Sequence, residues 1–279
     1  MFKNLFNLNK VDFMIVGAQK SGTTSLYYFL NQVNGIKGSN PKETDFFSYN
    51  LFYNKGYRFY HRTFFKGLNK SKLYFDASVE YLYLPYVAGR LYKYNPKLKL
   101  IICLRDPIER AKSAYKMYRY INSKDGELWR LNYLSHLKNH SLEYYKIGKE
   151  FYCQDKFPEF EELIDLEMSN INKKFCYRYY EPSLIKRGMY KSQIENLLKY
   201  FPIDQLYFLN ADNFKKNTEI EFHKILNFIG CKEMMQDIDF SQQLKDNSNT
   251  KLNLNEALIS DLKNIFKDAY YCLEKYTNK

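Results

Sequence analysis

The chain has few cysteines, and none of them is placed for zinc or dithiol chemistry. The five cysteines are odd in number and widely spaced, and no two of them form a C-x-x-C pair. This spacing excludes the common zinc and redox motifs and is typical of a reducing compartment. We therefore expect a cytoplasmic protein. The cysteines are Cys103, Cys153, Cys176, Cys231 and Cys272.

Long apolar runs are also missing. No stretch approaches the roughly 18 consecutive apolar residues that a membrane-spanning helix needs. The first segment, Met1–Asp12, mixes Asn and Lys with single apolar residues, so we expect neither an anchor nor a signal peptide there. There is no internal repeat and no low-complexity linker. With 279 residues, 45% of them hydrophobic, we expect one catalytic domain over residues 1–279.

Positive charge, by contrast, is in excess. The 43 Lys and Arg against 31 Asp and Glu give a formal net charge of +12, which favours nucleotides, acidic glycans, nucleic acid or anionic lipid as partners. Basic residues alternate with tyrosines over Tyr115–Tyr120, a pattern that can stack on single-stranded nucleic acid. Because 28 residues of the chain are Tyr, this pattern arises easily by chance, and we expect no nucleic-acid partner.

Short apolar runs alternate with helical patterns along much of the chain. Phe13–Gly17 and Leu98–Leu104 are each followed by a turn and by apolar residues at helical spacing. Leu73–Phe75 and Leu206–Leu209 are two further strand candidates. This alternation predicts an α/β fold, a P-loop-like, three-layer arrangement in which helices flank a central, mostly parallel sheet. Ligands of such folds bind at the carboxyl ends of the strands.

Two later regions have a different pattern. From about Asn122 to Glu181 the chain is charged, aromatic and helical in outline, without a strand-like run, and we expect a helical insertion that bears on the substrate. Leu254–Tyr276 carries apolar residues at helical spacing and predicts one C-terminal helix. The segment before it, Asp246–Lys251, is typical of a polar loop.

The residues Gly17–Ser25, called the phosphate loop from here on, suit an anion. Backbone N–H groups and the dipole at a helix N-terminus favour negative charge, and Lys20 and several hydroxyls can neutralise phosphate oxygens. A P-loop kinase has its Lys directly after the second Gly of the motif. Here Thr23 follows Gly22, and Lys20 precedes it. A small-molecule kinase of the P-loop class is therefore the alternative hypothesis.

Two motifs resemble those of one family. Val16–Leu26 resembles the loop that binds the 5′-phosphosulfate in sulfotransferases that use 3′-phosphoadenosine 5′-phosphosulfate (PAPS), and it is most similar to the heparan sulfate N- and 3-O-sulfotransferase branch. Arg105–Tyr115 resembles the family's 3′-phosphate motif, an Arg at a strand end and a Ser eight residues later. A guanidinium and a hydroxyl at this spacing can reach one phosphate. The resemblance implies PAPS binding by Lys20, Ser21, Gly22, Thr23, Thr24, Ser25, Arg105 and Ser113.

A third segment supplies the catalytic group. Asn40–Phe47 resembles the family's K-E-x-x-F-F segment, which implies that Glu43 is the general base. A sugar hydroxyl must lose its proton as it attacks sulfur, and a carboxylate within hydrogen-bonding reach can accept that proton. By the same resemblance, Lys20 stabilises the charge that grows on the leaving phosphate. We expect Lys42 to contact the acceptor.

One departure from the family concerns the acceptor. Asp76–Tyr81 stands where the family has E-K-S-x-x-Y, but Ala77 replaces the Lys that helps the acceptor or the sulfuryl group. This leaves PAPS binding intact and changes the geometry around the acceptor. We expect Asp76 and Ser78 to take over part of the role of that Lys.

Two later segments are similar to further parts of the family's ligand site. Arg187–Gln193 resembles its R-G-x-Y-x-x-Q segment, which implies either cofactor binding by Tyr190 or helix capping and packing. The polar loop that ends at Lys251 is similar to the loop that closes over the 3′-phosphate and adenine. We expect Lys251 to bind the cofactor, with Lys245 as the alternative.

The resemblance implies sulfuryl transfer to a hydroxyl or amine of a carbohydrate. Lys55–Tyr60 is similar to a K-G-x-x-W-Y stretch of the N-sulfotransferase domain, and the positive charge suits an anionic polysaccharide or a lipid-linked glycan. A steroid, a protein tyrosine, or a basic binding module without turnover stays open. The scheme needs no metal: His136 and His140 lie four apart, but no Glu follows His136 as in the zinc motif H-E-x-x-H.

Overall fold

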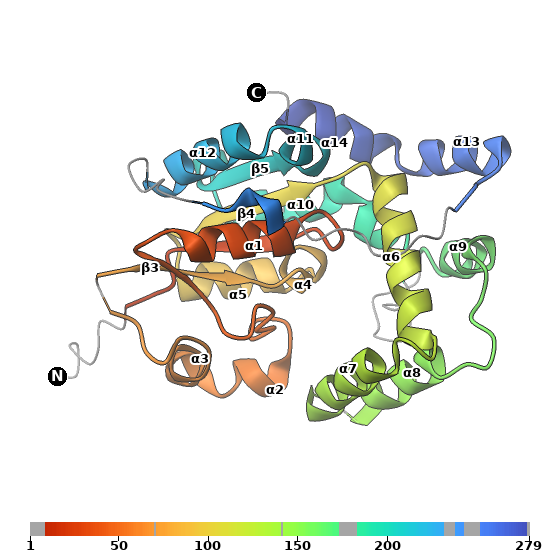
Figure 1. The fold of residues 1–279 in the computed structure, drawn as a ribbon, viewed down its shortest axis with the longest axis horizontal. Coiled ribbons are helices and arrows are strands. Elements are labelled where there is room, and N and C mark those ends of the chain that lie inside the picture. The colour runs from red at the N-terminus through yellow and green to blue at the C-terminus, as the bar shows by residue number, and fades with distance from the viewer. Residues whose placement is uncertain are drawn as a thin grey trace. The chain divides into compact units, whose positions relative to one another are not determined.

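The structure, a computed structural model, describes residues 9–69, 71–140, 142–172, 183–231, 238–242 and 252–277. The chain forms two compact units. The first comprises Met1–Leu104 and Gln193–Leu244, and the second comprises Arg105–Ser192 and Lys245–Lys279. Figure 1 labels the helices of both units and the strands β3, β4 and β5.

The first unit is built on a five-stranded parallel sheet with the strand order β2-β3-β1-β4-β5. β1 (Phe13–Gly17) is central, β3 (Leu73–Ala77) and β4 (Lys99–Leu104) are its neighbours, and β2 (Ile36–Gly38) and β5 (Leu206–Asn210) form the edges. The predicted α/β fold with a parallel central sheet flanked by helices is confirmed. The sequence does not predict β2, because three residues are too few for a recognisable apolar run.

Burial on both faces explains the apolar composition of the central strands. All five residues of β1 are buried, as in parallel sheets that carry helices on both sides. Phe13 and Ile15 join a core cluster with residues of α1 (Thr23–Gln32) and α12 (Thr218–Ile229). Because side chains alternate along a strand, Asp76 of β3 faces the opposite side, where it meets residues of other helices.

Shorter helices complete the first unit. α3 and α4 supply residues that contact the face of β3 opposite the core cluster. One of them, α10, begins in the residues of the second unit and continues in the first. These helices are α2 (Asn50–Tyr53), α3 (Gly56–Phe65), α4 (Glu80–Tyr83), α5 (Val87–Tyr94), α10 (Tyr190–Leu198) and α11 (Ala211–Lys216), with the 3-10 turns η3 (Ile203–Gln205) and η4 (Phe240–Gln242).

The described residues of the second unit are mainly helical. Its first helix begins with Asp106 as N-cap and Pro107 in the first turn, a combination that favours helix initiation. The region expected to form a helical insertion holds α7, α8 and α9. The helices are α6 (Pro107–Asn122), α7 (Glu127–His140), α8 (Leu142–Tyr152), α9 (Phe160–Ser169), α13 (Glu256–Ile265) and α14 (Lys267–Thr277), with the 3-10 turn η2 (Lys186–Gly188).

The C-terminal segment differs from the prediction of one helix, because α13 and α14 are separated at Phe266. The Phe266 side chain is 1% exposed and lies against Gly188. A Cβ at Gly188 would be 2.8 Å from the Phe266 ring, so this glycine leaves the space that the ring fills. Nowhere in the part of the chain that the structure describes is a helix both long and apolar enough to cross a membrane.

A buried carboxylate holds the segment before Gly188. Glu167 of α9 is 5% exposed, and its carboxylate accepts the backbone N–H groups of Leu184, Ile185 and Lys186 at 2.6, 2.8 and 2.8 Å. Burial raises the pKa of Glu167, and the three N–H groups oppose the rise. The bonds pair the N–H groups of Ile185 and Lys186 at the start of η2 and hold the segment that leads to the R-G-x-Y residues.

His61 of α3 provides a test of the packing in the first unit. Its ring is 5% exposed, its Nε2 lies 2.8 Å from the Tyr94 hydroxyl, and burial lowers the pKa of the imidazole to about 4 from 6.5. The unfolded chain binds the proton first, so the native state loses stability as the pH falls from 6.5 towards 4. Relative to His61→Gln, the wild type should lose up to about 3 kcal/mol of unfolding free energy over this range.

Denaturant unfolding of both proteins at several pH values measures this difference. A difference that stays constant between neutral and acidic pH would contradict a buried, neutral ring.

Candidate functional site

The phosphate loop begins at Gly17, where the end of β1 approaches the chain that follows β3. Gly17 has a φ of +140°, and a Cβ there would lie 3.0 Å from both the Val79 carbonyl oxygen and the Leu82 Cβ. A side chain suits neither that backbone angle nor that space. The next residue, Ala18, donates its N–H to the Cys103 carbonyl at 2.8 Å. The loop is therefore fixed to the ends of two neighbouring strands.

The loop passes into α1 through Gly22. Gly22 is the N-cap of α1, lies in the left-handed region at φ +82°, and makes no side-chain cap. The cap residue therefore does not compete with a ligand for the first N–H groups of the helix. Lys20 also has a positive φ of 64°, an uncommon angle for a residue with a side chain and one that tends to occur at ligand-binding loops.

Ser21 of the phosphate loop has a buried hydroxyl that suits an anion. It is 1% exposed, and among the residues that the structure describes its Oγ atom has no hydrogen-bond partner. A buried hydroxyl without a partner costs about 1 to 3 kcal/mol, so such groups call for an explanation. An anion oxygen bound in the loop would accept the hydroxyl proton. The neighbouring Thr23 is likewise buried at 4% exposure.

Glu43 is held next to the phosphate loop. Its Oε2 accepts the Val79 N–H at 2.9 Å, and its Oε1 forms an ion pair with the Lys42 ammonium. Since the carbonyl of the same Val79 lies against Gly17, one residue connects the carboxylate with the start of the loop. The Glu43 side chain is 37% exposed, so the carboxylate is oriented by the protein and still open to solvent.

Lys42 also lies close to the loop. Its side chain is 14% exposed. Burial raises the pKa of the Cys103 thiol to about 12, and the charge of Lys42 opposes this rise. Because the Cys103 carbonyl holds Ala18, the Lys42 ammonium is near the phosphate loop as well as paired with Glu43.

Asp76, at the end of β3, is the centre of a buried hydrogen-bond network. Its carboxylate accepts four hydroxyl groups: those of Thr44 and Tyr60 at 2.7 Å, and those of Tyr81 and Ser78 at 2.9 Å. Asp76 is 0% exposed. Burial raises its pKa to about 6, and the four hydroxyls oppose the rise.

The position of Asp76 and Ser78 bears on their predicted contact with the acceptor. Ser78 is also 0% exposed, and its Oγ accepts the backbone N–H groups of Thr44 and Asp45 at 3.0 and 3.2 Å. Neither side chain presents a surface to a ligand. The structure uses both residues to hold the segment directly after Glu43.

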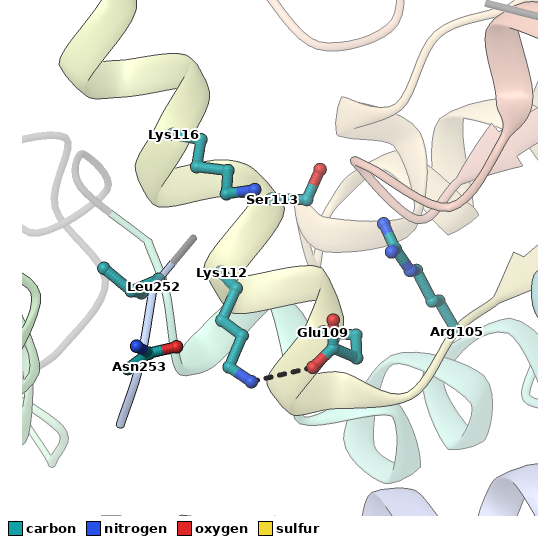
Figure 2. A pocket seen from close by; sticks show the side chains of 7 residues that line it. All are labelled: Arg105, Glu109, Lys112, Ser113, Lys116, Leu252 and Asn253. Atoms are coloured by element: carbon teal, nitrogen blue, oxygen red, sulfur yellow. Dashed lines mark hydrogen bonds and ion pairs between the residues drawn. The ribbon is translucent and has the colours of Figure 1, made fainter. Parts of the chain in front are cut away.

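A second cluster lies in the second unit. A cavity of about 200 Å³ is lined by Arg105, Glu109, Lys112, Ser113, Lys116, Leu252 and Asn253. Figure 2 shows Glu109, Lys112, Ser113 and Lys116 projecting from α6, with Arg105 from the segment before it. Three cations, a hydroxyl and an amide against one carboxylate make the cavity suitable for a phosphate. Lys112 is paired with Glu109 at 2.8 Å.

Two buried contacts support this cavity. The Tyr190 side chain is 0% exposed and donates its hydroxyl to the Arg105 carbonyl at 2.9 Å, so it orders the backbone of Arg105. The Asp106 Oδ1 accepts the N–H groups of Ile108 and Glu109, each at 2.9 Å. A P-loop kinase would need a carboxylate after a strand to hold magnesium, and Asp106, which follows β4, is instead occupied as the N-cap of α6.

The structure brings together some of the residues predicted from the sequence and adds others. The phosphate loop, Lys42 and Glu43 are neighbours in the first unit, and Arg105 and Ser113 line the cavity in the second. Lys251, and Lys245 as its alternative, lie outside the described residues. In the ranges that are described, no three His, Cys, Asp or Glu side chains are grouped to hold a metal.

Sequence reasoning missed Lys112, Lys116 and Asn253 at the cavity. Glu109, Lys112, Ser113 and Lys116 are spaced as one helical face, a pattern visible in the sequence. No local sequence pattern indicates that Asn253 lines the cavity.

Comparison with known proteins identifies relatives of the chain. A family model described as "Sulfotransferase domain" matches residues 10–268. The chain is 37% identical over 106 residues to the membrane-associated sulfotransferase kil1 of Dictyostelium discoideum, which covers 37% of this chain and 22% of that protein. It is 26% identical over 200 residues to the heparan sulfate glucosamine 3-O-sulfotransferase 5 of Homo sapiens, covering 71% and 47%.

Two further comparisons extend the coverage. The chain is 25% identical over 223 residues to the bifunctional heparan sulfate N-deacetylase/N-sulfotransferase 2 of Homo sapiens, covering 78% of this chain and 22% of that protein. The chain therefore spans only 22% to 47% of the length of these three curated relatives. A crystal structure of a sulfotransferase from Alicyclobacillus acidocaldarius has a TM-score of 0.63 at 22% identity and 96% coverage of both chains, which shows a shared fold.

Ser21→Ala tests whether the loop is built for an anion. Because the Ser21 hydroxyl is buried and has no partner within the described ranges, its removal should leave the melting temperature of the ligand-free protein unchanged or higher. It should weaken binding of 3′-phosphoadenosine 5′-phosphate (PAP) by about tenfold, one hydrogen bond to a charged group. Thermal melts and calorimetric titration measure both effects. A destabilised protein with unchanged affinity would contradict this role for the hydroxyl.

Proposed function

The chain belongs to the sulfotransferase domain family, and from this premise we propose that it transfers a sulfuryl group from PAPS to a hydroxyl or amine of a carbohydrate. The observation that carries the proposal is the link from Glu43 through Val79 to Gly17. It sets an oriented carboxylate at the edge of an anion-binding loop, as a reaction needs when an anionic donor meets a hydroxyl that must lose its proton.

The residues present fit the donor. The unpartnered Ser21 hydroxyl and the helix N-terminus behind Gly22 suit the 5′-phosphosulfate. The cavity with Arg105 and Ser113 suits the 3′-phosphate. When bound, PAPS supplies the sulfuryl group and leaves as PAP. Thr23, Thr24 and Ser25 follow Gly22 in the first turn of α1, and we assign them to the same phosphate end.

Glu43 is assigned as the general base. Its two oxygens are fixed by different partners, the Val79 N–H and the Lys42 ammonium, so the carboxylate is held in one orientation before the acceptor arrives. Orientation of this kind lowers the entropic cost of reaching a reactive geometry. The partial exposure of the Glu43 side chain gives the acceptor hydroxyl access to it.

Two lysines are assigned to the charges that develop during transfer. Lys20 belongs to the phosphate loop, and we assign it to the oxygen that becomes the leaving group. Lys42 is paired with Glu43, and its charge acts on Cys103, whose carbonyl holds the loop, which suits it to hold the acceptor or the sulfuryl oxygens. Ala77 offers no cation at the end of β3, so Lys42 is the described lysine best placed to supply that charge.

The arrangement does not favour the kinase alternative. Lys20 precedes Gly22, whereas a P-loop kinase has its Lys after the second Gly. The strand-end carboxylate that would hold magnesium, Asp106, is used as an N-cap and also accepts the Tyr270 hydroxyl at 3.1 Å. A phosphoryl-transfer enzyme of that class needs both features.

A carbohydrate acceptor is supported by the relatives. Two of them are named for heparan sulfate, one as a 3-O-sulfotransferase and one as an N-deacetylase/N-sulfotransferase. Together with the net charge of +12, this favours an anionic polysaccharide or a lipid-linked glycan as acceptor. A cytoplasmic location and a single domain with an acceptor-side insertion at about 122–181 stay predictions. No nucleic-acid partner is proposed.

Titration with PAP, compared with ATP and magnesium, tests the donor. Wild type should bind PAP, and Lys20→Ala and Arg105→Ala should each weaken binding at least about tenfold, because each removes a charged contact with a phosphate. Lys66→Ala, a lysine outside both clusters, is the control and should leave the affinity unchanged. Calorimetry or ligand-induced thermal shift gives the constants. Tight binding of ATP with magnesium and no response to PAP would reverse the assignment.

A further inference from the structure

We propose that Asp76 is the positioning residue of the catalytic base: its buried carboxylate fixes the segment that carries Glu43. This inference rests on the proposed function. It assigns Asp76 a role through Glu43 and not through contact with the acceptor, because the Asp76 side chain is 0% exposed and its hydroxyl partners all belong to the protein.

The network joins the end of β3 to the segment after Glu43 by two routes. In the first, the Asp76 Oδ2 accepts the Thr44 hydroxyl at 2.7 Å, and the Thr44 Oγ1 accepts the Phe46 N–H at 3.2 Å. In the second, the Asp76 Oδ1 accepts the Ser78 hydroxyl at 2.9 Å, and the Ser78 Oγ accepts the N–H groups of Thr44 and Asp45. Three consecutive backbone N–H groups are thus held from one carboxylate.

The held segment begins directly after the base. Glu43 is bonded to Thr44 in the chain, and its carboxylate accepts the N–H of Val79, the residue after Ser78. The backbone next to Glu43 and the Glu43 carboxylate are therefore both held by residues of the turn after β3. Asp45 has a positive φ of 49°, so the backbone here needs the N–H contacts to keep its bend.

Stability alone does not explain a carboxylate at this position. Burial raises the pKa of Asp76 to about 6, which means that the folded protein holds the charged form less favourably than the unfolded chain does and bears a cost for that form at neutral pH. A buried acceptor of four hydroxyls does, however, define the direction of every donor around it. A charged group at this position is explained if the donors that it orients fix the position of Glu43.

The other groups that face Asp76 are mostly tyrosines. Tyr60 of α3 and Tyr81 of α4 donate to it, and burial together with the Asp76 charge raises the pKa of both phenols. Burial, and to a smaller extent the charge of Asp76, also raises the pKa of Tyr94 of α5 and of Tyr27 of α1. The charge of Asp45 contributes to the raised pKa of Tyr81. Asp76 therefore titrates among neutral phenols and one further carboxylate.

Asp76→Asn tests the proposal, because it keeps the shape and removes the charge. We expect the rate constant kcat of sulfuryl transfer to fall at least about tenfold, since small misplacement of a base is costly. The affinity for PAP should stay within about twofold of wild type, because the phosphate loop is untouched. In wild type the rate should fall as Asp76 gains a proton near pH 6, and this limb should be lost in the variant.

Asp12→Asn is the matched control. Asp12 is a half-buried carboxylate that accepts the Tyr74 N–H at 2.8 Å, next to the amino ends of β1 and β3, and burial raises its pKa too. The same substitution there removes a carboxylate beside the same two strands, but at their amino ends and away from Glu43. It should change stability without lowering kcat.

Thr44→Val tests the first route and remains informative if Asp76→Asn does not fold. It should also lower kcat with PAP affinity kept, and the double variant should be no slower than Asp76→Asn, because both changes break one connection. Unchanged kcat in Asp76→Asn and Thr44→Val, with PAP bound and turnover by wild type, would overturn the inference alone. Failure of the wild type to bind PAP would instead overturn the proposed function.

Discussion

The close approach of Val79 to Gly17 is the constraint on which the rest of the site depends. A parallel sheet gathers the carboxyl ends of its strands at one edge, and there the carbonyl oxygen of Val79 lies 3.0 Å from where a Cβ on Gly17 would stand. That contact is tight, and the φ of +140° at Gly17 is one that glycine adopts readily and other residues rarely do. The N–H of the same Val79 holds Glu43, so the spacing between the anion loop and the carboxylate follows from one backbone contact.

Each of the two units has a buried carboxylate that orders the residues around it. Asp76 organises hydroxyls around the segment after Glu43, and Glu167 organises backbone N–H groups before the R-G-x-Y segment. Burial raises the pKa of both. Glu43 in the first unit and Arg105 in the second, both proposed to meet the ligand, are partly exposed, whereas the two acids that fix backbone segments are buried. Function here therefore draws on interactions that stability alone does not favour.

Much of the fold could be predicted because its signals are local. Apolar runs such as Phe13–Gly17 and Leu98–Leu104 define the central strands, and their alternation with helical patterns indicates a parallel sheet. β2 has three residues and no run. At the break between α13 and α14, the Phe266 ring packs against a distant glycine, Gly188, which has no side chain to occupy that space. Contacts between segments far apart in the sequence leave no such pattern.

The same distinction applies to the site. The phosphate loop, Arg105 and Ser113 stand in contiguous motifs, and Lys112 and Lys116 extend the helical face of Ser113. The burial of Asp76 could not be predicted, because its hydroxyl partners come from a loop, α3 and α4. The sequence shows that an acid follows an apolar strand. It does not show whether that acid meets a ligand or four hydroxyls.

Transfer of label from radiolabelled PAPS to a set of anionic and neutral glycans, by wild type and Glu43→Gln, tests the central claim most directly. The account predicts that wild type labels at least one glycan and that Glu43→Gln does so at least about a hundredfold more slowly, the range expected for loss of a general base. Both proteins should bind PAP equally. Equal rates of transfer by the two proteins would contradict the role of Glu43, and binding of PAP without transfer to any glycan would contradict the proposed reaction.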